Sequence, residues 1–106
     1  MTNKDFNQCV ENQLMRCKQI LQHKQDEYSD EYDRLDHFKR AAGLLGQDPK
    51  NALCGMMAKH TVSIYEMCQS DQKFPMEKWE EKITDHINYL LLLFALICEE
   101  EGEPHA

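Results

Sequence analysis

Three polar side chains lie just before the most apolar segment of the chain. Glu81, Asp85 and Asn88 are spaced by four and three residues, so a helix would present them on one face. Residues 89–98, which follow, are almost entirely apolar. A carboxylate beside such a segment must be ion-paired, hydrogen-bonded or metal-bound. The spacing therefore predicts a polar or metal-binding site around Asp85, while Asn88 could instead fix the register of helices at an interface.

A second group of candidates comes from the middle of the chain. Lys59, Ser63 and Glu66 share one face of a predicted helix, where Lys59 could bind a phosphate and Glu66 a metal ion. The structural alternative is a surface polar network of Lys59 and Glu66, with Asp85 in a salt bridge to Lys59 or Arg40. His60 falls within the apolar stripe of this helix and is expected to be a core imidazole with one hydrogen bond.

A third group is an acidic segment in which six carboxylates fall within eleven positions. Hard oxygen ligands of this kind suit Mg²⁺ or Mn²⁺, and Glu27 is the member that could join Glu66 and Asp85 around one ion. The structural alternative is a solvated helix start that the helix dipole favours. The six residues are Asp26, Glu27, Asp30, Glu31, Asp33 and Asp36.

The spacing of apolar residues predicts four helices, at about residues 4–28, 33–45, 49–69 and 75–100. Asp33 is the expected N-cap of the second helix, and Gly46 is expected to end it. Asp48 followed by Pro49 should start the third, and Pro75 the fourth. No alternating pattern typical of strands competes. We therefore predict an all-α four-helix bundle in a single domain, residues 1–100, with a disordered acidic tail at 101–106.

The last predicted helix is apolar nearly all round. One stripe contains Ile83, Ile87, Leu90, Phe94 and Ile97, while further leucines cover much of the remaining surface. Three other helices are too few to surround it, so we expect a second subunit to cover part of it, as in a homodimer or larger oligomer. The alternative is a compact monomeric bundle.

Composition and charge exclude several classes of protein. The 12 basic and 19 acidic residues give a formal charge of −7, which argues against a general nucleic-acid-binding surface. The apolar segment is well short of the ~20 residues that span a bilayer, and no secretory signal is recognisable, so we expect a cytoplasmic protein with no membrane contact. The five cysteines are never spaced as CxxC and are expected to be reduced and mostly buried.

Four blocks of sequence, at residues 24–28, 34–42, 55–64 and 81–90, resemble small phage and prophage proteins of unassigned function. These proteins look like distant members of the all-α, MazG-like group of nucleoside triphosphate pyrophosphohydrolases. The resemblance covers about residues 20–97. It implies an oligomeric helical bundle in which carboxylates on two central helices bind Mg²⁺ and a nucleotide triphosphate.

The chain departs from that enzyme group at the metal-binding motifs. The group has EExxE on one helix and ExxD on the next, whereas the corresponding segments here are residues 59–63, KHTVS, and 82–85, KITD. Of the carboxylates in these two motifs, only the last has a counterpart here, which is Asp85. Loss of the other carboxylates should abolish the usual two-metal arrangement, unless Glu27, Asp33, Glu66 or Glu81 replaces them.

Two classes of function follow from these observations. In the enzyme interpretation, Glu27, Glu66 and Asp85 hold Mg²⁺ or Mn²⁺, Lys59 steadies a phosphate, and water attacks a nucleotide phosphorus. In the alternative interpretation, the chain is a non-catalytic oligomeric module that binds a nucleotide or a protein. The residues that would activate the water in the enzyme interpretation are not identified by the sequence.

Overall fold

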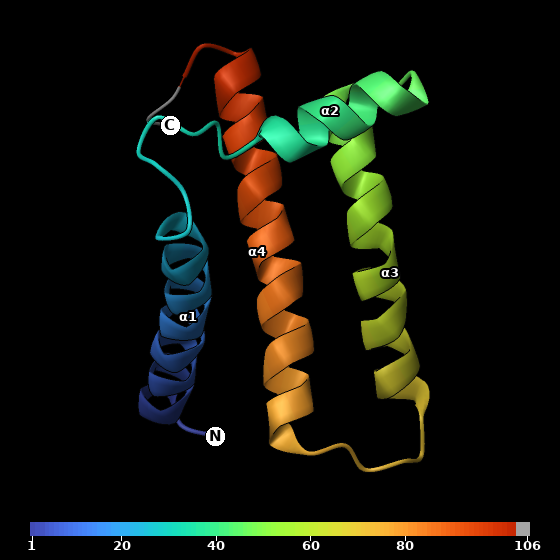
Figure 1. Cartoon of the computed structure of the whole chain (residues 1–106). Helices are drawn as coiled ribbons and strands as arrows, with labels where there is room; N and C mark the ends of the chain where they lie inside the picture. Colours follow the sequence, from blue (N-terminus) through green and yellow to red (C-terminus); the bar gives the residue numbers. More distant parts are fainter. Residues whose placement is uncertain (104–106) are drawn as a thin grey trace. The chain divides into compact units, whose positions relative to one another are not determined.

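A computed structural model describes residues 1–103, and in this range the chain forms four α-helices and no strand (Figure 1). This confirms the predicted all-α class with four helices. The chain divides into two compact units, Met1–Tyr32 and the part from Asp33 onward, which are described separately below. The last helix ends at Glu100, as expected, and residues 104–106 of the predicted tail lie outside the described range.

The first unit consists mainly of α1 (Asn3–Gln25). Thr2 caps its start, because the Thr2 hydroxyl accepts a hydrogen bond from the backbone N–H of Asp5 at 3.1 Å. The helix ends three residues before the predicted boundary at Tyr28. Beyond Gln25 the chain turns, and the rings of Tyr28 and Tyr32 stack with their centroids 4.2 Å apart.

The second unit begins with a turn that leads into α2 (Asp36–Leu45). The predicted role of Asp33 as the N-cap of this helix is wrong, since Leu35 occupies that position. The Asp33 carboxylate nevertheless accepts the N–H of Leu35 at 3.0 Å, so it stabilises the turn before the helix. The helix ends at Gly46 as predicted, in the left-handed conformation with φ 65°, and Gln47 donates back to the Ala42 carbonyl.

Helix α3 (Pro49–Gln69) starts where the sequence predicts. The Asp48 carboxylate accepts the N–H of Asn51 at 2.9 Å, and Pro49 occupies the first turn, where a missing N–H is harmless. Helix α4 (Met76–Glu100) follows a short loop and starts immediately after Pro75. None of the helices in the described part of the chain is long and apolar enough to cross a membrane.

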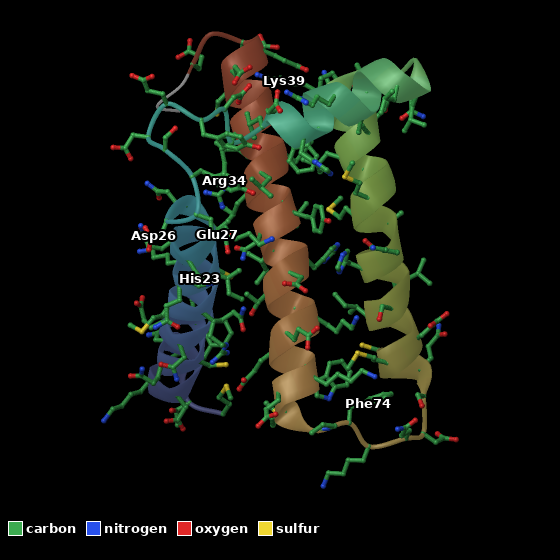
Figure 2. All side chains as sticks on the ribbon, in the orientation of Figure 1. His23, Asp26, Glu27, Arg34, Lys39 and Phe74 are labelled. Atoms are coloured by element: carbon green, nitrogen blue, oxygen red, sulfur yellow. The ribbon has the colours of Figure 1, made fainter. Side chains whose placement is uncertain are left out.

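Helices α3 and α4 run antiparallel to each other, and α2 crosses near the ends where α3 begins and α4 finishes (Figure 1). At the opposite end, the connecting loop is held by Phe74, whose ring meets Trp79 edge-on at 5.9 Å. The ammonium group of Lys78 lies 4.7 Å from the centre of the Phe74 ring (Figure 2). These contacts hold the end of the loop against the first turn of α4.

The core of the second unit lies where its three helices meet. Leu35 and Phe38 come from the segment that contains α2, Leu53 from α3 and Leu96 from α4, and all four are buried. Around them pack half-buried apolar residues of the two long helices. These are Met56, Met57, Tyr89, Leu92 and Leu93. Removal of this apolar surface from water is the main force that holds the three helices together.

Two lysines tie the C-terminal end of α4 to its neighbours. Lys39 forms ion pairs with Asp33 and with Glu99, and Figure 2 shows Lys39 beside the end of α4. Lys50, at the start of α3, pairs with Glu100 at 2.9 Å. The hydrogen bond from Lys39 lowers the pKa of Asp33, and the partner carboxylates raise the pKa of both lysines. The ion pairs therefore favour the folded unit while both partners are charged.

Leu53→Ala tests the position of the core. Leu53 is 0% exposed, so truncation should lower the free energy of unfolding by about 2–5 kcal/mol through lost burial and a residual cavity. The matched control is Leu44→Ala on α2, where the side chain is 88% exposed and a change within about 0.5 kcal/mol is expected. Urea denaturation of both variants measures the difference, and equal losses of stability would contradict the described core.

Lys39→Met tests the ion pairs at the end of α4. The lowered pKa of Asp33 contributes to the free energy of unfolding at pH values above 3.8, the ordinary pKa of the group. This contribution is lost as the pH falls through the pKa of the folded state. The raised pKa of Lys39 contributes to the free energy of unfolding at pH values below 10.5, the ordinary pKa of the group. This contribution is lost as the pH rises through the pKa of the folded state. Because the pairs are partly exposed, we expect a loss of about 0.5 kcal/mol near neutral pH in low salt.

The measurement is denaturant unfolding of wild type and Lys39→Met across pH. The difference should shrink in acid, where the partner carboxylates are protonated, and in high salt. A difference of the same size below about pH 3 would show that Lys39 stabilises the fold through packing of its alkyl chain rather than through charge.

Candidate functional site

Asp85 lies on α4, half-buried, at the point where the helix becomes apolar. Its carboxylate has no hydrogen bond or ion pair within residues 1–103. The salt bridge considered between Asp85 and Arg40 does not form, because the Arg40 guanidinium pairs with Asp36 at 2.7 Å. No bridge joins Asp85 to Lys59 in the described range either. A half-buried carboxylate without an internal partner is available to an external cation.

A hydrogen bond in the middle of the helix pair sets the register of α3 against α4. The Thr61 hydroxyl and Nε2 of His86 are 2.8 Å apart. The His60 ring packs against Tyr89 close by, with centroids 4.9 Å apart and planes inclined by 42°. Because the helices are antiparallel, we infer that Asp85 lies near the level of Ser63 on the facing helix.

From this register we infer that the candidate residues lie along one edge of the helix pair. On α3, Thr61 lies across the helix from Lys59, Ser63 and Glu66. On α4, Asp85 and His86 lie on opposite sides of Tyr89, which faces α3. Thr61 and His86 meet at one edge of the helix pair, so the candidate residues of both helices lie at the opposite edge. We call this set the polar edge, and it consists of Lys59, Ser63, Glu66, Glu81 and Asp85.

The members of the polar edge differ in burial. Lys59, Glu66 and Glu81 are exposed, whereas Ser63 and Asp85 are half-buried. Asn88, one turn beyond Asp85, is buried. Chemically, the edge offers carboxylate oxygens to a hard cation and an ammonium group to an anion.

His60 occupies the predicted position in the apolar stripe of α3. The expected hydrogen bond is not formed at Nδ1, which is buried and has no hydrogen-bond partner within the described range. The His60 ring instead packs against the ring of Tyr89. The sequence does not predict the interhelical bond between Thr61 and His86, because no local pattern shows which residues of two helices face each other.

The acidic segment is engaged locally in both units. In the first unit, Asp26 accepts a hydrogen bond from Gln22, and Glu27 lies 3.9 Å from the imidazole of His23 (Figure 2). In the second unit, Lys39 pairs with Asp33, and Arg40 with Asp36, as described above. These contacts favour the structural interpretation of the segment, in which its acids support turns and helix ends.

The predicted metal ligands are distributed over both units. Glu27 belongs to the first unit, whereas Glu66 and Asp85 belong to the second. Across residues 1–103, no three His, Cys, Asp or Glu side chains form a group that could hold a metal ion. The set of Glu27, Glu66 and Asp85 therefore stays a prediction, as does the choice of Mg²⁺ or Mn²⁺.

All five cysteines are free thiols, but the expectation that most are buried is wrong. Cys17 and Cys98 are buried, whereas Cys9, Cys54 and Cys68 are exposed. The exposed three lie on α1 and α3, each of which also presents part of its surface to solvent.

Comparisons with known proteins add no assignment, since no protein-family model, no curated protein and no solved structure matches this chain. The candidate residues are therefore judged by their own geometry.

Thr61→Val tests the hydrogen bond that sets the helix register. Valine keeps the shape of threonine but removes the hydroxyl, so His86 loses its partner and the free energy of unfolding should fall by about 1 kcal/mol. Thr61→Ser keeps the hydroxyl and is the control. Thermal unfolding measures stability, and NMR of the His86 ring reports the change in hydrogen bonding. Unchanged ring resonances in Thr61→Val would contradict the bond.

Proposed function

We propose that this chain is a MazG-like helical module that binds the magnesium complex of a nucleotide at the polar edge, without two-metal hydrolysis. The observation that carries the proposal is the half-buried carboxylate of Asp85, which has no internal partner within residues 1–103. Lys59, on the facing helix, likewise has no ion pair in that range. The negative charge of Asp85 complements a metal ion, and the positive charge of Lys59 complements the phosphates that the metal ion binds.

The ligand chemistry follows from the residue types. Mg²⁺ is usually held by one or two carboxylates together with phosphate oxygens and several waters. Asp85 and Glu81 lie one turn apart on one face of α4 and supply the carboxylates. Lys59 supplies a positive charge for the phosphates. The nucleotide would thus bring the remaining metal ligands itself, so no third protein carboxylate is required.

The residues at the altered motifs support binding rather than hydrolysis. In the enzyme group that the chain resembles, this stretch of α3 carries carboxylates. Here the His60 ring packs against Tyr89, and the Thr61 hydroxyl contacts His86. These positions thus contribute to the packing of the helix pair. Two-metal catalysis needs carboxylates on both sides of the reacting phosphate, which these side chains do not provide.

One observation favours the alternative of a metal-dependent nucleotide pyrophosphohydrolase. Glu66 on α3 lies near the level of Glu81 on α4, so both helices retain one carboxylate at the polar edge in addition to Asp85. If a metal ion bridged them, the arrangement would resemble a reduced form of the enzyme group's site. Turnover of a nucleotide, rather than binding alone, distinguishes this alternative.

The experiment is a titration of Mn²⁺ and a nucleoside triphosphate into wild type and variants. Asp85→Asn keeps the shape of the side chain but removes its charge, so Mn²⁺ affinity in the presence of nucleotide should fall about tenfold or more. Lys59→Met should weaken nucleotide binding. Asp71→Asn, an exposed acid in the loop before α4, is the matched control and should bind as wild type does.

Melting curves of the same variants separate binding from a structural role. We expect Asp85→Asn to keep or raise the melting temperature, because the change removes a half-buried charge that has no internal partner within residues 1–103. A lower melting temperature with unchanged Mn²⁺ affinity would assign Asp85 to the fold. Release of pyrophosphate by wild type would select the enzyme alternative, and no saturable binding would reject both.

A further inference from the structure

The face of α4 that carries Asp85 continues toward the loop between α3 and α4. Lys78 precedes Asp85 by seven residues, or two helical turns, so the two side chains lie on one face with Glu81 between them. Lys78 is exposed and forms no ion pair within residues 1–103, although Glu81 is only one turn away. The positive charge of Lys78 is therefore not neutralised by a carboxylate of the described range.

The ammonium group of Lys78 lies instead over an aromatic ring of the loop. Its nitrogen is 4.7 Å from the centre of the Phe74 ring, and Figure 2 shows Phe74 at the loop end of the helix pair. Trp79, half-buried, meets the same ring edge-on at 5.9 Å. We call Phe74, Lys78 and Trp79 the aromatic corner. Because a cation–π contact at an exposed site is weak, a ligand can displace the ammonium group from the ring face.

The charged groups and the ring follow one another along the helix pair in an order that fits one extended ligand. By the register inferred above, Lys59 lies about one turn beyond Asp85, on the side away from the loop. Glu81 lies one turn from Asp85 on the loop side, and Lys78 is about 10 Å from Asp85 at the rise of an α-helix. The Phe74 ring comes last. The order is thus a cation, two carboxylates, a second cation and an aromatic face.

We propose that the aromatic corner binds the base of the nucleotide. This inference rests on the proposed binding of the magnesium complex at the polar edge. The terminal phosphates and the metal ion would lie between Lys59 and the carboxylates, and the base would stack on the Phe74 ring in place of the Lys78 ammonium group. That ammonium group would then pair with the phosphate nearest the sugar. Stacking does not read the hydrogen-bonding edge of a base, so purines and pyrimidines should both be accepted.

The test compares two ligands that share their phosphates and differ in the base. These are the magnesium complexes of adenosine triphosphate and of inorganic triphosphate, and calorimetric titration of the full chain measures the affinity of each. Trp79 is the only tryptophan of the chain, so its fluorescence reports on the aromatic corner. Adenosine triphosphate should quench this fluorescence, whereas inorganic triphosphate should change it far less.

Phe74→Leu removes the ring but keeps an apolar side chain of similar size. Affinity for adenosine triphosphate should fall about tenfold through the loss of stacking, while affinity for inorganic triphosphate should not change. Phe74→Tyr keeps the ring and should bind both ligands as wild type does. The matched control is Tyr65→Leu on α3, which removes an aromatic ring that is 65% exposed and outside the polar edge, and it should leave both affinities unchanged.

The outcomes separate this inference from the proposed function. If neither ligand binds, the proposed function fails and the inference fails with it. If both bind and Phe74→Leu weakens neither, or weakens both equally, the polar edge still binds the phosphates, and only the inference about the base is overturned. Circular dichroism checks the fold of Phe74→Leu. Should that variant unfold, the wild-type fluorescence decides, and equal quenching by the two ligands would overturn the inference.

Discussion

The antiparallel packing of α3 against α4 is the constraint on which the candidate site depends. The Thr61–His86 hydrogen bond and the His60–Tyr89 contact set which residues of the two helices lie at the same level. Once this register is fixed, Lys59 and Asp85 lie at the same edge of the pair. A slip of one residue would rotate α4 by about 100° relative to the site. The chemistry of the edge is thus a consequence of the helix register.

Helix α4 presents different surfaces in different directions. Tyr89 and Leu96 face the core of the second unit, while Leu90 and Phe94 are exposed on the apolar stripe. Asp85 lies on a further face, beside α3. This separation explains why the helix is apolar nearly all round yet still carries a polar candidate site.

The helix boundaries were predictable wherever the signal is local. Asp48 with Pro49, and Gly46, act through their own backbone neighbourhood, so the sequence alone locates the start of α3 and the end of α2. The role of Asp33 was misassigned, because its carboxylate caps a turn before the helix and also pairs with Lys39. The Thr61–His86 bond depends on tertiary register, which no local pattern encodes. The polar edge could therefore be predicted only as separate residues.

The most direct test of nucleotide binding at the polar edge is paramagnetic NMR with Mn²⁺ and a nucleoside triphosphate. Bound Mn²⁺ broadens amide resonances according to their distance from the ion, so the pattern locates the site on the chain. We predict that broadening at low Mn²⁺ is strongest around Glu81 and Asp85, includes Lys59, and requires the nucleotide. Broadening centred on the acidic residues 26–36, or spread evenly over the surface, would contradict it.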